Sequence, residues 1–305
     1  MKNKILLLIV VVLSVIAISG SKKETTYFNN AKKEEVKEEI KLALKDTLTG
    51  EIKNIELEDY IVGVVAGEMP ASFNEEALKA QAIASRTYAM YKMKNSNGTY
   101  DLVTDKTNQV YITEDKMKSL WQENFDYYFE KIKKAVYDTK DLIMTYNGDI
   151  ILSLYFARSN GKTEDAILVF GSNEEYLKSV ESPEESLTSE VTISKDEFCN
   201  KLNISCDAIN ISNVLKSSSG RINSLNINGK TFKGTEIRTL FDLKSTDFDI
   251  SIGSEIKFVT KGYGHGVGMS QYGANKLAQN GKNYEEILKH YYQNINIEKL
   301  VYKMW

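Results

Sequence analysis

The apolar run Tyr60–Gly67 restricts the possible folds of this chain more than any other stretch. It ends at an acid, Glu68, and Pro70 follows two positions later. A proline disfavours helical dihedral angles at the preceding residue, so a helix through Val62–Ala66 is predicted to end near Glu68. Asn74 is typical of the residue that caps a second helix, and that helix is rich in alanine. The stretch therefore predicts two closely packed helices with an acid where they meet.

Glu68 has two physical reasons to retain its proton. Its neighbours Val64, Val65 and Met69 are apolar, and burial disfavours a charged carboxylate. The negative end of the preceding helix dipole disfavours the charge further. Both effects raise the pKa of Glu68, which suits a general acid near neutral pH. On these local features alone, a surface glutamate at a helix end is the commoner case, so both interpretations remain open.

The composition is that of a globular protein. The chain has 305 residues, of which 42% are apolar and 27% charged, enough to bury a core in one large domain or two joined ones. The net charge is −3, and acidic and basic residues are interleaved along the chain. Because no basic stretch stands out, we expect no nucleic-acid partner.

The stretch around Glu68 resembles the signature of the stage II sporulation protein D family. The resemblance is carried by Val65–Pro70, Glu76–Ala82 and Arg86–Ala89, and it extends over most of the chain after about residue 40. Members are lytic transglycosylases of peptidoglycan, with a catalytic glutamate in an E-M-P turn before a helix of this type. The resemblance implies that Glu68 is the catalytic acid.

Residues 1–21 have the pattern of a secretion signal, with Lys2 and Lys4 ahead of the apolar run Ile5–Ile18. The residues alone leave open a cleaved signal peptide and an uncleaved membrane anchor. The resemblance implies an anchor with the catalytic part on the extracytoplasmic side, and the two lysines agree with a cytoplasmic N-terminus. Residues 22–39 are dense in charge and are predicted to form a solvated tether.

The rest of the chain predicts an α+β fold. A catalytic lobe is expected over residues 40–186 and a mostly β lobe over 187–260. Residues 261–305, a glycine-rich return segment and C-terminal helices, are expected to complete the catalytic lobe and so form a glycan cleft. The predicted elements are a hairpin within 40–57, a helix over 116–139, a hairpin of 142–146 with 150–156, and a helix near 195–202.

A polar loop after the second hairpin is a candidate substrate site. Ser159, Gly161 and Thr163 match the family's run of small polar residues, which the resemblance implies lines the glycan cleft. Hydroxyls and bare backbone amides suit sugar hydroxyls, although an ordinary polar turn is the alternative. Arg158 departs from the pattern. We hypothesise that Arg158, Lys162 or the amides that open the helix after residue 269 bind the lactyl carboxylate of peptide-stripped strands.

The segment 261–274 has glycine at four alternate positions, which an ordinary strand would not tolerate. We expect something to approach this backbone closely. The run is a second match to the family, and it places His265 and Gln271 among the expected substrate-binding residues. Two interpretations of His265 remain open: it contacts substrate or positions Glu68, or it is a buried, hydrogen-bonded histidine. The other histidine, His290, is interpreted as structural.

No metal or cofactor is expected. Many relatives hold zinc with a histidine and two cysteines near residues 104–108, whereas here Thr104 and Asn108 occupy this place. We expect hydrogen bonds and packing to hold the loop instead. Gln109 follows this loop. Two roles remain open for it: it faces the substrate cleft, or it serves the turn. Cys199 and Cys206 are interpreted as a disulfide or as two buried thiols, with no further cysteine for a metal site.

The resemblance implies cleavage of the β-1,4 bond between N-acetylmuramic acid and N-acetylglucosamine, with the muramyl O6 closing on C1 to give a 1,6-anhydro end. The strands are expected to be stripped of peptides, in septal wall degradation during sporulation engulfment, beside an amidase of the engulfment machinery. Asp59 and Glu164 remain candidates for a second carboxylate. The rival prediction is a catalytically inactive glycan-binding or scaffold paralogue. The loss of the zinc ligands near 104–108 and the changes at Ala157 and Arg158 favour it, whereas Glu68 disfavours it.

Overall fold

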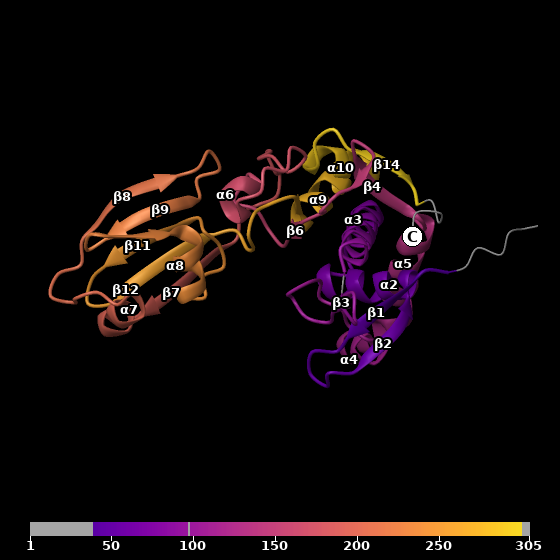
Figure 1. Cartoon of the computed structure of the whole chain (residues 1–305), viewed down its shortest axis with the longest axis horizontal. Coiled ribbons are helices and arrows are strands. Elements are labelled where there is room, and N and C mark those ends of the chain that lie inside the picture. Colours follow the sequence, from indigo (N-terminus) through magenta and orange to yellow (C-terminus); the bar gives the residue numbers. More distant parts are fainter. Residues whose placement is uncertain (1–38, 97, 301–305) are drawn as a thin grey trace, which may run out of the picture. The chain divides into compact units, whose positions relative to one another are not determined.

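The computed structural model describes residues 39–96 and 98–300 (Figure 1). The predicted signal or anchor over 1–21 and nearly all of the predicted tether lie outside these residues. Within the described part of the chain, none of the helices combines the length and the apolar character needed to span a bilayer.

The chain before Glu68 forms the predicted hairpin. β1 (Lys41–Lys45) pairs antiparallel with β2 (Ile52–Glu56), and β3 (Leu102–Val103) adds to the other edge of β1 in parallel. β2 leads directly into α2 (Leu57–Glu68). The small sheet thus sets where α2 begins.

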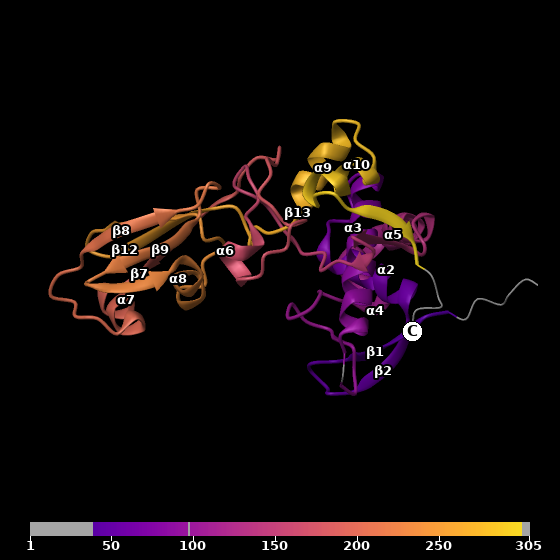
Figure 2. The ribbon, with the colours of Figure 1, turned by 45° about the horizontal axis from the view of Figure 1, so that its top comes forward.

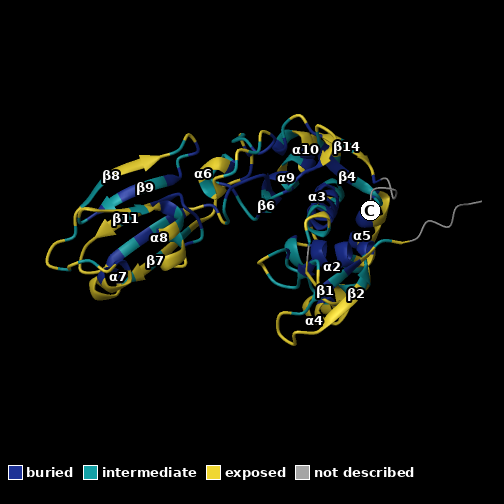
Figure 3. Ribbon diagram, in the orientation of Figure 1, coloured by how far each residue is buried: buried dark blue, intermediate teal, exposed yellow. Residues whose placement is uncertain are grey.

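The predicted pair of helices is confirmed. α2 ends at Glu68, with Met69 as its extended C-terminal cap, and α3 (Glu75–Lys94) follows. Asn74 caps α3 by accepting a hydrogen bond from the Glu76 amide at 3.0 Å. α3 packs against α2, and Figure 3 shows that most of both helices is buried. Burial of the two helices fixes Glu68 at the junction between them.

The prediction of one helix over 116–139 is wrong. The chain forms α4 (Glu114–Trp121), a 3₁₀ turn (Gln122–Asn124) and α5 (Phe125–Asp138). The break falls at Gln122, which has a φ of 47°, and no proline or glycine marks it. Packing overrides the helical pattern here: Met117 of α4 is buried, and the Trp121 ring stacks on Phe125 with their centroids 6.4 Å apart.

The second hairpin is shorter than predicted. β4 (Leu142–Tyr146) and β5 (Asp149–Ile150) pair around the predicted Asn-Gly turn. The expected strand over 150–156 is wrong, because only β6 (Tyr155–Phe156) resumes it, and β6 pairs in parallel with β13 (Met269–Ser270). The glycine-rich return segment is therefore the pairing partner of the part of the strand that does form.

The C-terminal part of the chain completes the first hydrophobic core, the one that contains α2, α3, α5 and β4. β13 leads into α9 (Gln271–Gln279), followed by α10 (Tyr284–Tyr291) and β14 (Asn296–Lys299), which pairs antiparallel with β4. Figure 2 shows α9 and α10 side by side, and both contact α3. A short helix, α6 (Ala166–Phe170), lies in the loop region after β6.

A second hydrophobic core is formed by residues between Val191 and Phe258. Its centre is a group of contacting rings, Phe198, Phe241, Phe248 and Phe258. Around them lie β7 (Thr188–Ile193), α7 (Lys195–Leu202), β8 (Ile211–Lys216), β9 (Ile222–Ile227), β10 (Lys230–Lys233), α8 (Gly234–Leu240), β11 (Phe248–Ile252) and β12 (Ile256–Lys261).

The strands of this second core form two three-stranded antiparallel sheets, in the orders β10-β9-β8 and β11-β12-β7. The predicted helix near 195–202 is confirmed as α7. Cys199 and Cys206 form a disulfide, which decides between the two alternatives left open by the sequence. The mixture of helix and sheet agrees with the expected α+β class, whereas the glycan cleft and the domain boundaries stay predictions.

Candidate active site

Glu68 is the centre of a cluster of hydrogen-bond donors that come from three distant parts of the chain. Its Oε1 accepts from the backbone amide of Val110 at 2.7 Å and from the Tyr155 hydroxyl at 3.5 Å. Its Oε2 accepts from Nε2 of Gln271 at 3.2 Å. The carboxyl group is thus fixed in orientation by one main-chain and two side-chain donors.

The surroundings of Glu68 favour its protonated form. Burial raises the pKa of Glu68 above its ordinary value, and the hydrogen bonds from Val110, Gln271 and Tyr155 only partly oppose this effect. No described lysine, arginine or histidine forms an ion pair with the carboxylate, so no cation offsets the cost of burial. The local argument from the sequence predicted the same direction for the same main reason.

Two glycines of α2 explain how Val110 reaches Glu68. A Cβ atom at Gly67 would collide with the Val110 carbonyl and side chain, and one at Gly63 would collide with the Tyr111 ring. Only a helix face without side chains lets the segment 110–112 lie against it. This close approach carries the Val110 amide to the C-terminal end of α2.

Gln109 lies behind the site rather than on its surface. It is 1% exposed, and its Nε2 donates to the Tyr155 hydroxyl at 3.0 Å and to the Ser85 carbonyl at 3.2 Å. Its Oε1 accepts from the Tyr60 hydroxyl at 3.1 Å. These partners lie outside the turn that Gln109 was expected to serve, and contact with substrate stays a prediction. Burial keeps the pKa of Tyr155 well above its ordinary value, so this phenol remains a donor toward Glu68.

The loop at 104–108 is held as expected for a chain without the zinc ligands. Asn108 Oδ1 accepts from the Val103 amide at 2.8 Å, and the Thr104 hydroxyl accepts from the Thr47 amide at 3.2 Å. Across residues 39–96 and 98–300, the structure gathers no group of three or more His, Cys, Asp or Glu side chains suited to a metal ion.

The glycine-rich segment is approached closely, as expected, and the approaching group is the protein itself. Gly262, Gly264, Gly266 and Gly268 all have positive φ, between 77° and 119°. A Cβ at Gly264 would lie 2.7 Å from that of Phe156, and one at Gly268 would collide with the Leu154 carbonyl. The segment therefore lies directly on β6 and delivers Gln271, at the start of α9, to Glu68.

His265 faces away from Glu68. Its Nδ1 accepts from the Val267 amide at 3.1 Å, and its ring contacts Phe156 and Phe170 at centroid distances of 5.7 and 5.4 Å. Adjacent strand residues point to opposite faces, so Tyr155 reaches Glu68 while Phe156 meets His265. Burial, with the charges of nearby arginines, lowers the pKa of His265 to about 4. These contacts agree with a hydrogen-bonded, partly buried histidine, and contact with substrate stays a prediction.

Two of the hydroxyls expected to bind sugars are inside the protein. Ser159 and Thr163 are 0% exposed. The Ser159 hydroxyl accepts from the Gly161 amide at 3.0 Å, and that of Thr163 accepts from the Val180 amide at 2.8 Å. In this structure both hydroxyls meet protein groups, and their contact with sugar stays a prediction. They hold the loop because a buried hydroxyl needs a partner.

The other expected residues of this loop are accessible. Gly161 has a φ of 110° and open space where a Cβ would stand. Lys162 pairs with Glu181 at 2.9 Å, whereas the Arg158 guanidinium lies 3.7 Å from the centre of the Tyr272 ring. Tyr272 follows Gln271 in α9. The structure thus brings Arg158 next to the element that contacts Glu68 and leaves Lys162 in a surface ion pair.

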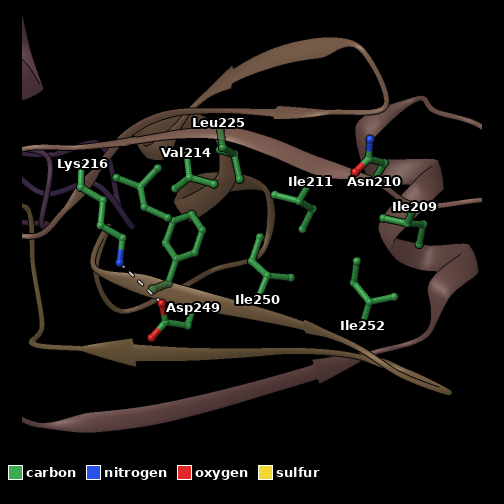
Figure 4. Close-up of a pocket in the computed structure, with 11 residues that line it drawn as sticks. Ile209, Asn210, Ile211, Val214, Lys216, Leu225, Asp249, Ile250 and Ile252 are labelled. Atoms are coloured by element: carbon green, nitrogen blue, oxygen red, sulfur yellow. Dashed lines mark ion pairs between the residues drawn. The ribbon is translucent and has the colours of Figure 1, made fainter.

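The structure has two hollows of note, one beside Arg158 and one in the second hydrophobic core. A small one of about 200 Å³ is lined by Arg158, Tyr272, Lys276 and other residues of α9 and its surroundings. A larger one of about 450 Å³ lies in the second core, between β8 and β11, with an apolar lining crossed at one end by the Lys216–Asp249 ion pair (Figure 4). The larger hollow receives no residue from the cluster around Glu68.

Comparison with known proteins finds that residues 45–146 match the family model described as Stage II sporulation protein (SpoIID). The chain is 39% identical over 265 residues to Stage II sporulation protein D of Bacillus subtilis (strain 168), covering 83% of this chain and 77% of that protein. The protein of the same name from Bacillus amyloliquefaciens is 39% identical over 260 residues, covering 81% and 76%. A Bacillus subtilis protein named Amidase enhancer is 31% identical over 294 residues, covering 75% of this chain and 39% of the relative.

Proposed function

This chain belongs to the stage II sporulation protein D family, and we propose that it is a lytic transglycosylase of peptidoglycan. Its substrate is the peptide-stripped glycan strand, cut between N-acetylmuramic acid and N-acetylglucosamine, in septal wall degradation during sporulation engulfment. The observation that carries the proposal is the carboxyl group of Glu68: partly buried, free of cationic partners among the described residues, and oriented by three donors.

Glu68 acts twice in the proposed reaction. As an acid it protonates the departing O4 while the bond between C1 and O4 breaks. As the resulting carboxylate it accepts the proton of the muramyl O6 hydroxyl, whose oxygen forms the new bond to C1. The proton count closes, no water is consumed, and the product carries a 1,6-anhydro ring. The three donors lower the cost of the carboxylate between the two steps.

The other candidate carboxylates are engaged elsewhere, which supports a mechanism with one acid. Glu164 is 1% exposed, and its Oε2 accepts from the hydroxyls of Ser217 and Ser219. Asp59 is exposed and accepts from the Tyr137 hydroxyl at 3.4 Å. Neither carboxyl is among the hydrogen-bond partners of Glu68. Ordinary glycoside hydrolysis uses two carboxyl groups on either side of the bond.

The decisive experiment compares the full-length protein in mild detergent with its Glu68→Gln variant on peptide-free glycan strands. Products are separated by mass, because anhydro ends, reducing ends and released peptides differ. Glu51→Gln, the same change at an exposed glutamate, is the control. We expect anhydro ends from the wild type and the control only. Anhydro ends from Glu68→Gln at the wild-type rate contradict the proposal.

The second candidate is a glycan-binding or scaffold protein without activity, which acts through an amidase. The name of one relative, Amidase enhancer, favours it. We propose an amidase as partner under either candidate, with residues 1–21 as a membrane anchor and the remainder extracytoplasmic. Strand binding without any cleavage product in the same experiment identifies the scaffold.

A further inference from the structure

Glu184 is a buried carboxylate that lies close to the candidate site and has no role in the proposed reaction. It is 9% exposed. Its Oε1 accepts from the Ser159 amide at 2.7 Å and from the Ser270 hydroxyl, and its Oε2 accepts from the Ser182 hydroxyl at 2.6 Å. Three chain segments that are far apart in sequence therefore meet at one carboxyl group.

Glu184 keeps its charge without an ion pair among the described residues. Burial acts to raise the pKa of Glu184, but the hydrogen bonds from Ser182, Ser270 and Ser159 outweigh it and lower the pKa. A buried carboxylate in this condition is tolerated only while its donors stay in place. The three donors and the carboxylate thus hold each other in a fixed arrangement.

One of these donors begins the helix that reaches Glu68. Ser270 is the N-terminal cap of α9, and its hydroxyl accepts from the Gly273 amide at 3.2 Å while it donates to Glu184. Gln271 is the next residue, and its Nε2 donates to Glu68. A Cβ at Gly273 would lie 2.7 Å from Oε2 of Glu184, so the first turn of α9 packs directly on the carboxylate.

We propose that Glu184 is a positioning residue for Glu68: it fixes the first turn of α9 through Ser270, and so keeps the Gln271 amide on the Glu68 carboxyl. Glu184 touches neither Glu68 nor the reacting atoms. Side chains that support a site from behind in this way set its geometry to within a fraction of an ångström. The activity part of the inference rests on the proposed function, whereas the link from Glu184 to Glu68 does not.

Glu184→Gln keeps the shape of the side chain but replaces one accepting oxygen with a donating NH₂ that faces donors. With α9 loosened, Gln271 no longer stabilises the carboxylate, so the pKa of Glu68 rises further. The titratable groups that interact electrostatically with Glu68 are the phenols of Tyr60, Tyr88 and Tyr155. The substitution of Glu184 changes none of these side chains. Glu185→Gln, the same change at the exposed neighbouring residue, is the matched control.

The first measurement needs no activity. The free energy of unfolding of each full-length protein is measured against pH, with and without Glu68→Gln, because the difference reports how folding shifts the pKa of Glu68. The proteins are the wild type, Glu184→Gln, Gln271→Leu and the double variant. We expect both single changes to raise the pKa of Glu68, and the double change to raise it no further than Gln271→Leu alone. Equal shifts from Glu184→Gln with and without Gln271, or no shift at all, overturn the proposal.

The second measurement is cleavage of peptide-free strands. Glu184→Gln is expected to lower kcat about tenfold at unchanged KM, and to move the alkaline limb of the pH profile upward. A purely structural role lowers stability without moving that limb. If Glu184→Gln does not fold, Ser270→Ala tests the same link from its other end with the same expected shift. If the wild type cleaves nothing, the proposed function fails while the first measurement still decides the role of Glu184.

Discussion

Nε2 of Gln271 lies 3.2 Å from Oε2 of Glu68, although 203 positions of sequence separate the two residues. The contact joins the C-terminal end of α2 to the first residue of α9. Glycines on both sides of the contact make it possible, because Gly67 lets Val110 lie against α2 and Gly268 lets the return segment lie against Leu154. The consequences can be tested at Glu68 and at the segments that hold it.

Replacing Glu68 with glutamine is expected to stabilise the protein more at about pH 7 than at about pH 4. Burial raises the pKa of Glu68 in the folded state, so the wild type loses stability, relative to the neutral amide, as the pH rises through that pKa. Denaturant unfolding of both proteins at the two pH values measures the effect. A stability difference that is constant with pH, or larger in acid, contradicts a raised pKa.

Acid is expected to destabilise the wild type through His265. Its pKa is lowered from 6.5 to about 4 in the folded state, so folding favours the neutral ring, and the stability present above pH 6.5 is lost as the pH falls toward 4. His265→Asn keeps an acceptor for the Val267 amide and removes this loss. Melting temperatures between these pH values compare it with His290→Gln, which should retain the acid sensitivity. An equal acid response of His265→Asn and the wild type refutes this assignment.

Glycine at position 268 is expected to be indispensable to the fold. Gly268→Ala combines a φ of 77° with a collision against the Leu154 carbonyl, whereas Gly171→Ala has a φ of 78° and open space around the added atom. We expect Gly171→Ala to cost about 1 kcal/mol and Gly268→Ala at least about 2 kcal/mol more. Denaturant midpoints of the two variants measure the difference. Equal costs indicate that the return segment can move away from β6.

Arg158 is expected to matter more than Lys162 for stripped strands. Arg158 stacks on Tyr272 beside Gln271, while Lys162 is already paired with Glu181 at the surface. Arg158→Ala should raise KM about tenfold, and Lys162→Ala about twofold or less. Initial rates at several strand concentrations measure both. Undiminished rates in the two variants and in the double change count against carboxylate binding by either side chain.

The elements signalled by local residues could be predicted from the sequence. Pro70 and Asn74 act on their own neighbours, so the end of α2 and the cap of α3 follow from them. The burial that raises the pKa of Glu68 was visible in its apolar neighbours. The four alternate glycines predicted that another group approaches this backbone closely. Their spacing does not identify that group, which the structure shows to be β6 and the residue before it.

The donors to Glu68 and the fate of the polar loop could not be predicted in the same way. The Val110 amide and the Tyr155 hydroxyl reach Glu68 across 42 and 87 positions, a result of tertiary packing. Ser159 and Thr163 suggested sugar ligands by type, yet the segment 178–184 covers them. The sequence shows that these side chains are polar, and only the fold decides whether water, sugar or protein meets them.

The shortest contact of the Glu68 carboxyl is with a main-chain group, the Val110 amide. Nineteen of the twenty amino acids supply that N–H, so exchange of the side chain at this position conceals the donor from any comparison of residue types. Proline is the exception, because its ring replaces the hydrogen. Such a contact depends on the course of the backbone, so relatives with the same fold can keep it while the residue type at this position changes.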